Sequence, residues 1–171
     1  MKNTTFIALV LFSTLTYGQV IIGTGKTSPT NTSVSLEFGT ENKGIILPYV
    51  DAAASVTAAV PGTIIFDAAD KKIKVKLTGS WKDLTIVNSG VVPATPAFES
   101  EQTSAKVIIG SNPAAETANG ILILSDANKA MILPTVNAYT DIVSPSPGMM
   151  VYLSGAKQVA CYNGAVWSFW K

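Results

Sequence analysis

The sequence predicts a mainly β protein that consists of two tandem, pseudo-repeated small β modules. The first observation is a repeat: the segment 43–50, KGIILPYV, returns 86 residues later as 129–136, KAMILPTV. The same offset carries the segment 61–66, PGTIIF, onto 147–152, PGMMVY. The second observation is an alternation of apolar and polar residues, which is typical of half-buried strands. Repetition at a fixed period indicates duplication of one structural unit.

A three-strand meander is expected in the first module between residues 62 and 85. Its middle strand is predicted by the segment Lys72–Leu77, which alternates without exception. This pattern places Ile73, Val75 and Leu77 on one face of a strand and three lysines on the opposite, solvated face.

The second module repeats the meander in three strands, expected at 148–153, 158–162 and 166–170. Asn163 and Gly164 separate the last two strands, and this dipeptide is a strong signal for a tight hairpin turn.

Two further elements precede the meander in each module. An N-terminal strand pair is expected to begin at Val20–Gly23, and its counterpart at Val107–Gly110. The alanine-rich segment Asp51–Val60 predicts a short helix or a turn. Its counterpart, Asn137–Ser146, contains Pro145 and more β-branched residues, so a helix there is at best short.

The N-terminus predicts export from the cytoplasm. Lys2 precedes an apolar run of about ten residues that ends near Leu15, well short of the roughly 20 residues that span a bilayer. Gly18 is a small residue at the position expected for cleavage. We therefore expect no membrane span and a cell-surface, extracellular or periplasmic location. The expected organisation is a signal peptide at 1–18, β module 1 at 19–87, a linker at 88–106 and β module 2 at 107–171.

The composition argues against most catalytic chemistries and against nucleic-acid binding. Only 13% of the residues are charged, the net charge is +1, and the chain has no histidine. Because all basic residues are lysines, no guanidinium is present for bidentate phosphate or base recognition. Without histidine, the commonest general base and metal ligand is missing. We expect no enzyme activity, no cofactor and no metal site.

Two residue patterns are better explained by structure than by chemistry. Gly23–Thr27, GTGKT, ends like a phosphate-binding loop, but Val20 stands where the first glycine should be and Pro29 prevents the helix that should follow. A turn is the expected structure. Cys161, the single cysteine, falls on the face expected to be buried and is predicted to be a core thiol.

Aromatic side chains at the ends of the two meanders are the candidate contact residues. They are Trp81, Trp167, Phe169 and Trp170. Trp81 and Trp167 occupy equivalent positions in the repeat, which favours a role in the architecture. Phe169 and Trp170 have no aromatic counterparts and are better candidates for an interface, where aromatic residues are enriched. Stacking of these rings on a glycan is the alternative.

The segments described above resemble a module found in secreted proteins of Bacteroidota and in phage tail-fibre-like proteins. The resemblance rests on these elements: Ile22-Gly23-Thr24, Asn42–Pro48, Pro61–Phe66 and Tyr162–Trp167. At Tyr49 and Thr135 the chain departs from the family pattern, which often has arginine after the proline. The resemblance implies a non-catalytic structural or adhesin-type protein. Its expected partners are further copies of itself, in a homotrimer, or another envelope or surface protein.

Overall fold

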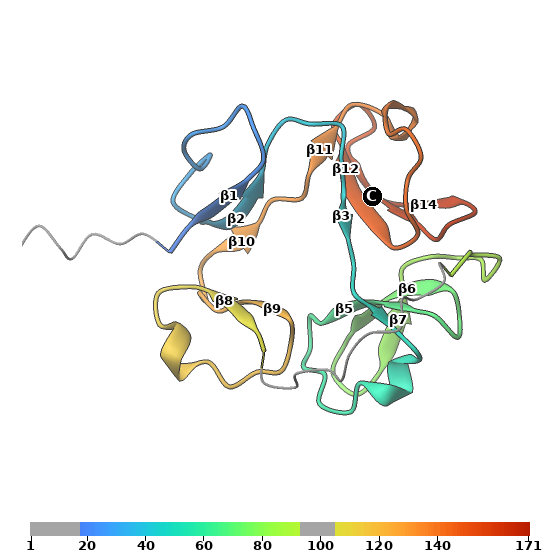
Figure 1. Ribbon diagram of the computed structural model, residues 1–171, viewed down its shortest axis with the longest axis horizontal. Coiled ribbons are helices and arrows are strands. Elements are labelled where there is room, and N and C mark those ends of the chain that lie inside the picture. Colours follow the sequence, from blue (N-terminus) through green and yellow to red (C-terminus); the bar gives the residue numbers. More distant parts are fainter. Residues whose placement is uncertain (1–17, 93–104) are drawn as a thin grey trace, which may run out of the picture.

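The computed structural model describes residues 18–92 and 105–171, and its regular structure is mainly β strand (Figure 1). The predicted mainly β class is therefore confirmed. The predicted signal peptide, apart from Gly18, and residues 93–104 of the expected linker lie outside the described residues. The strands are β1 (Val20–Ile22), β2 (Val34–Phe38), β3 (Ile45–Ile46), β4 (Tyr49–Val50), β5 (Ile64–Asp67), β6 (Lys72–Lys76), β7 (Trp81–Asp83), β8 (Val107–Ile109), β9 (Leu122–Leu124), β10 (Ala130–Met131), β11 (Thr135–Val136), β12 (Met149–Leu153), β13 (Gln158–Tyr162) and β14 (Trp167–Trp170).

Both predicted meanders are present. Strands β5, β6 and β7 pair antiparallel in order, and so do β12, β13 and β14. A short parallel strand borders each meander, β4 against β5 and β11 against β12. The turn after β13 contains Gly164 at φ +95°, as the Asn163-Gly164 dipeptide predicts, because glycine tolerates this left-handed conformation.

The expected N-terminal strand pairs are parallel. In β1 and β2, Val20 lies opposite Leu36, and in β8 and β9, Val107 lies opposite Leu122. The offset is therefore 87 residues in the first strand of the pair and 86 in the second. The connection between the paired strands is one residue shorter in the C-terminal half of the chain.

The alanine-rich segment forms a single 3₁₀ turn at Ala53–Ser55, and its counterpart forms one at Tyr139–Asp141. A third such turn lies at Pro113–Ala115. The more β-branched counterpart therefore forms as much helix as the alanine-rich segment. In the part of the chain that the structure describes, no helix has the length and apolar character needed to cross a membrane.

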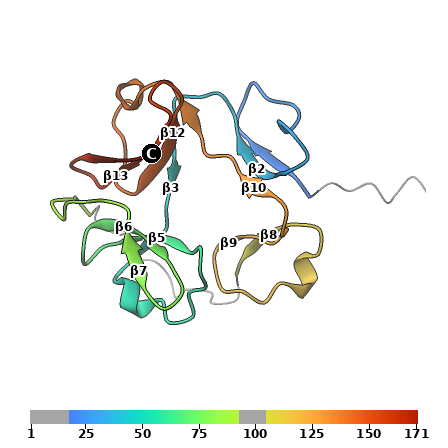
Figure 2. The ribbon, with the colours of Figure 1, turned by 180° about the vertical axis from the view of Figure 1, so that it is seen from behind.

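Strands from the two halves of the chain pair with each other. β3 lies antiparallel to the start of β12, with Ile46 opposite Met149, and β10 lies parallel to β2. Figure 1 shows β3 running from the sheet of β1 and β2 towards the sheet of β5–β7, past β12. The view from behind in Figure 2 shows the same crossing. The two halves therefore share sheets.

One of the two buried clusters is also shared between the halves. It consists of Leu47, Phe66, Ile73, Met150 and Cys161, with partly buried residues from both meanders around it. Burial of large apolar side chains is the dominant stabilising contribution to such a fold, at roughly 1.5–3 kcal/mol per side chain. A second cluster lies within the C-terminal half: Val136, Ile142, Met149, Val151, Leu153 and Ala160.

The prediction for the two faces of Lys72–Leu77 is wrong at two residues. Lys74 is only 8% exposed, and Leu77, expected on the buried face, is 44% exposed. Lys74 is buried because carboxylates from the neighbouring turn and strand surround its ammonium group. Leu77 lies beyond the last residue of β6, where the chain has already left the sheet.

Candidate interaction surface

The contact between the halves centres on a Pro-Gly turn. Tyr49 donates a hydrogen bond from its hydroxyl to the carbonyl oxygen of Pro147 at 2.5 Å. The ring of Tyr49 packs edge-on against Phe66, with the ring centroids 5.2 Å apart. A Cβ atom at Gly148 would lie 3.4 Å from Phe66, so the turn is in van der Waals contact with this aromatic pair. Burial raises the pKa of Tyr49, so its hydroxyl remains a donor at neutral pH.

A second seam joins the chain after β7 to the hairpin of β13 and β14. Asn163 is fully buried and donates from its side-chain amide to the carbonyl oxygen of Val87 at 2.9 Å. The amide of Val91 donates to the carbonyl oxygen of Asn163 at 3.0 Å. Asn163 also accepts from the backbone amides of Ala165 and Val166, which closes the hairpin turn. The first residues of the expected linker therefore lie against the C-terminal half.

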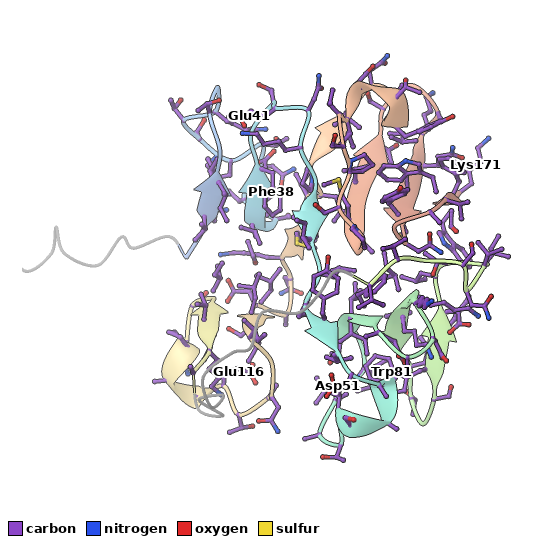
Figure 3. The ribbon with its side chains drawn as sticks, turned by 45° about the vertical axis from the view of Figure 1, so that its right-hand side comes forward. Phe38, Glu41, Asp51, Trp81, Glu116 and Lys171 are labelled. Carbon is purple, nitrogen blue, oxygen red and sulfur yellow. The ribbon has the colours of Figure 1, made fainter. Side chains whose placement is uncertain are left out.

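The four candidate aromatic residues do not gather at one place. Trp81 is half-buried on the β5–β7 sheet, under the ammonium group of Lys76, which lies 5.5 Å from its ring centroid. Trp170 donates from its indole nitrogen to the carbonyl oxygen of Leu84, so it belongs to the second seam. Figure 3 shows Trp81 and the C-terminal Lys171, the neighbour of Trp170, on different sheets. The remaining two, Trp167 and Phe169, form a separate group.

Trp167 and Phe169 flank Tyr139, a residue that the sequence analysis did not single out. The ring centroid of Tyr139 lies 6.0 Å from that of Trp167 and 5.5 Å from that of Phe169. Tyr139 and Phe169 are exposed and border a shallow hollow that also includes Asn137 and Gln158. The sequence does not indicate this group, because Tyr139 belongs to the 3₁₀ turn and not to the meander.

A largely buried ion cluster lies on the first meander, on the face of β6 opposite Ile73. Lys74 contacts Asp67 at 3.1 Å and also pairs with Asp70. Asp67 accepts hydrogen bonds from the backbone amides of Ala53 and Asp70. Burial opposes ionisation of both Asp67 and Lys74, but these hydrogen bonds outweigh it, so the pKa of Asp67 is lowered and that of Lys74 is raised. The corresponding positions of the second meander, 86 residues on, hold Leu153 and Ala160, so the cluster is not repeated there.

The Gly23–Thr27 segment is an irregular stretch with bends and no helix, and Lys26 makes an ion pair. The ammonium group of Lys26 pairs with Glu37, which is buried in β2. Glu37 also accepts from the backbone amide of Thr30 at 2.8 Å. Burial opposes ionisation of Glu37, but the hydrogen bonds from Lys26 and Thr30 prevail and its pKa is lowered. Lys26 therefore holds a loop onto β2.

Cys161 lies in the shared cluster and is fully buried, as predicted. Burial raises the pKa of its thiol to about 12. The thiolate is the reactive form of cysteine, so this side chain acts as a small apolar residue. Within residues 18–92 and 105–171, no group of three or more His, Cys, Asp or Glu side chains is placed to hold a metal ion.

Residues 108–170 match the family model described as the phage tail like trimerisation region. The matched region runs from β8 into β14 and includes the second meander. The match supports a tail-fibre-like module in this half of the chain, and the family is a structural one. No curated protein and no solved structure matches the chain.

Proposed function

We propose that the protein is an exported, non-catalytic structural component that self-associates as a trimer through tail-fibre-like β modules. The observation that carries this proposal is the match of residues 108–170 to a trimerisation region. The neutral composition and the sharing of strands between the two halves support it, because such sheets are held by backbone pairing and apolar contact, which a second chain can also supply.

We further propose that the two halves are tandem copies of one module. Several backbone hydrogen bonds recur at the offset of 86 residues and support the duplication. The amide of Phe66 donates to the carbonyl oxygen of Pro48, and that of Tyr152 donates to Pro134. Lys71 and Lys157, at equivalent turn positions, have positive φ angles of 58° and 54°. A resemblance to secreted proteins of Bacteroidota supports a role at the cell surface, with an adhesin-type or envelope partner.

Light scattering of the purified chain over a range of concentrations tests the self-association. The proposal expects three times the mass of one chain. Export is tested separately, by fractionating cells that produce the full sequence and determining the N-terminus of the exported protein. We expect Gln19 as its first residue, and a cytoplasmic protein that begins at Met1 would contradict export.

A second candidate function, glycan binding, is favoured by the exposed rings of Tyr139 and Phe169 beside their hollow. Aromatic faces and nearby amide side chains, here Asn137 and Gln158, suit the apolar and hydroxyl surfaces of a sugar. Titration with soluble polysaccharides should then change tryptophan fluorescence, because Trp167 lies beside Tyr139. The variant Phe169→Ala should abolish the change, and Trp81→Ala should leave it intact.

A further inference from the structure

We infer that copies of this chain join head to tail, with the C-terminal half of one copy bound to the N-terminal half of the next. The contacts between copies repeat those that join the two halves within one chain. This inference rests on the proposed self-association and names the surfaces that it uses. It follows from three differences between equivalent positions of the two halves.

The first difference is in burial. Leu36 of β2 is 0% exposed, whereas its counterpart Leu122 of β9 is 48% exposed. Phe66 is 0% exposed, and its counterpart Tyr152 is 36% exposed. In the chain, β10 pairs with β2, with Met131 opposite Leu36, and the Pro147-Gly148 turn lies against Phe66. Leu122 and Tyr152 are the exposed counterparts. Equivalent elements of a further module, placed as the second half is placed on the first, would cover them.

The second difference is in strand pairing. The start of β12 is paired with β3, and the amide of Leu47 extends this pairing by donating to the carbonyl oxygen of Gly148 at 3.1 Å. The equivalent stretch of the first meander is Gly62–Ile64. Among residues 18–92 and 105–171, no strand lies against this side of it. An open edge of this kind is a template for another strand.

The third difference is in the two Pro-Gly turns. A Cβ atom added at Gly148 would lie 3.4 Å from Phe66 and 3.5 Å from Tyr49, whereas one added at Gly62 would meet no atom of the described residues within 4 Å. Gly62 has a φ angle of +93° and Gly148 one of +76°, so both turns have the left-handed glycine conformation. The turn at Gly62 therefore has the conformation of the docked turn but lacks its contacts.

The open surfaces complement each other. The amides of Ala130 and Ile132 donate to the carbonyl oxygens of Ser33 and Leu36, which directs one side of this segment towards β2. Because amides alternate along an extended chain, those of Met131 and Leu133 face the other side. They correspond to Ile45 and Leu47, the residues that pair with β12. Met131–Leu133 of one copy can thus pair with Gly62–Ile64 of the next.

The same docking covers the remaining exposed positions. The edge of β9 that is not paired with β8 meets the edge of the next copy's β3 that is not paired with β12. The pairing of β2 with β10 within one chain is the model for this contact. Tyr152 receives the Pro61-Gly62 turn, as Phe66 receives Pro147-Gly148. One copy supplies different surfaces at its two ends, so the contact is heterologous and ends only when a ring closes. Three chains in such a ring would agree with the proposed trimer.

An engineered disulfide tests the register. Ile46 lies opposite Met149 within the chain, so Ile132 is expected opposite Thr63 of the next copy. The double variant Thr63→Cys with Ile132→Cys should form covalent oligomers up to the trimer on non-reducing gels. The matched control, Ile46→Cys with Met149→Cys, should form its disulfide within one chain and run as a monomer. Cys161 is buried and stays out of both reactions.

Single variants establish the polarity of the contact. Thr63→Cys alone and Ile132→Cys alone should each remain monomeric on the gel, whereas co-production of the two should give a covalent dimer. A trimer by light scattering whose double variant forms no covalent oligomer would overturn the head-to-tail register and leave the trimer standing. A chain that is monomeric by light scattering would contradict the proposed self-association, and the inference with it.

Discussion

The hydroxyl of Tyr49 donates to the carbonyl oxygen of Pro147, which lies 98 residues further along the chain. Tyr49 is one of the two residues that follow the proline of the repeated Ile-Leu-Pro segment, the other being Thr135. Tyr49 makes a direct contact between the halves. Within the described structure, the side-chain hydroxyl of Thr135 donates only to the carbonyl oxygen of Leu133, at 3.3 Å in its own segment.

Changes at Tyr49 should destabilise the contact between the halves. Tyr49→Phe removes one hydrogen bond and should lower the free energy of unfolding by about 1 kcal/mol. Tyr49→Ala also removes the packing against Phe66 and should cost roughly 3 kcal/mol or more. Urea unfolding at a fixed protein concentration measures both. Thr135→Ala is the control and should change stability by less than about 0.5 kcal/mol, so equal effects at the two positions would refute the contact.

Asp67 and Lys74 should be strongly coupled. Asp67→Leu or Lys74→Ala alone leaves a buried charge with fewer partners and should cost about 3 kcal/mol. The double variant reproduces the Leu153 and Ala160 pair of the second meander and should cost less than the sum of the single changes. Urea unfolding of all four proteins gives the coupling energy. Additive effects would show that the ion pair contributes nothing of its own.

The same pair predicts how stability depends on pH. The pKa of Asp67 is lowered from 3.8, so its contribution is present above pH 3.8 and is lost as the pH falls through the folded value. The pKa of Lys74 is raised from 10.5, so its contribution is present below pH 10.5 and is lost as the pH rises through the folded value. Thermal unfolding from pH 2 to 12 should show both losses, and the double variant should show smaller ones. Equal losses in both proteins would assign them to other groups.

Cys161 should be inert in the folded protein. Its thiol is buried and its pKa is raised to about 12, so the thiolate is scarce at neutral pH and reagents cannot reach it. A colorimetric thiol reagent should react slowly with the native chain and stoichiometrically after unfolding in guanidinium. Rapid reaction with the native chain, or a covalent dimer of the wild type on a non-reducing gel, would contradict this placement.

The meanders could be predicted from the sequence because their strands are long enough to show alternation and recur at one offset. The pairing of β3 with β12 and of β10 with β2 could not be predicted. β3 and β10 have only two residues each, so they show no alternation that a sequence pattern could detect. The burial of Lys74 could not be predicted for a related reason. Alternation places its side chain opposite Ile73, but only the fold shows that Asp67 and Asp70 enclose it there.

The candidate surface was predictable in kind but not in detail. The aromatic residues of β14 were recognised, whereas the partner of Trp167 and Phe169 is Tyr139, from a turn with no aromatic counterpart in the first half. Leu36 and Leu122 occupy equivalent positions of the two parallel strand pairs. Only the structure shows that one is covered and the other exposed.

The central claim, self-association through the open edge at β9, is tested most directly by the molar mass of two variants beside the wild type. Leu122→Glu places a charge on this edge, and Val143→Glu places one on a loop residue that is 88% exposed. Light scattering should give three times the chain mass for the wild type and for Val143→Glu, and the mass of one folded chain for Leu122→Glu. A wild type with the mass of one chain, or a Leu122→Glu variant that remains trimeric, would contradict the account.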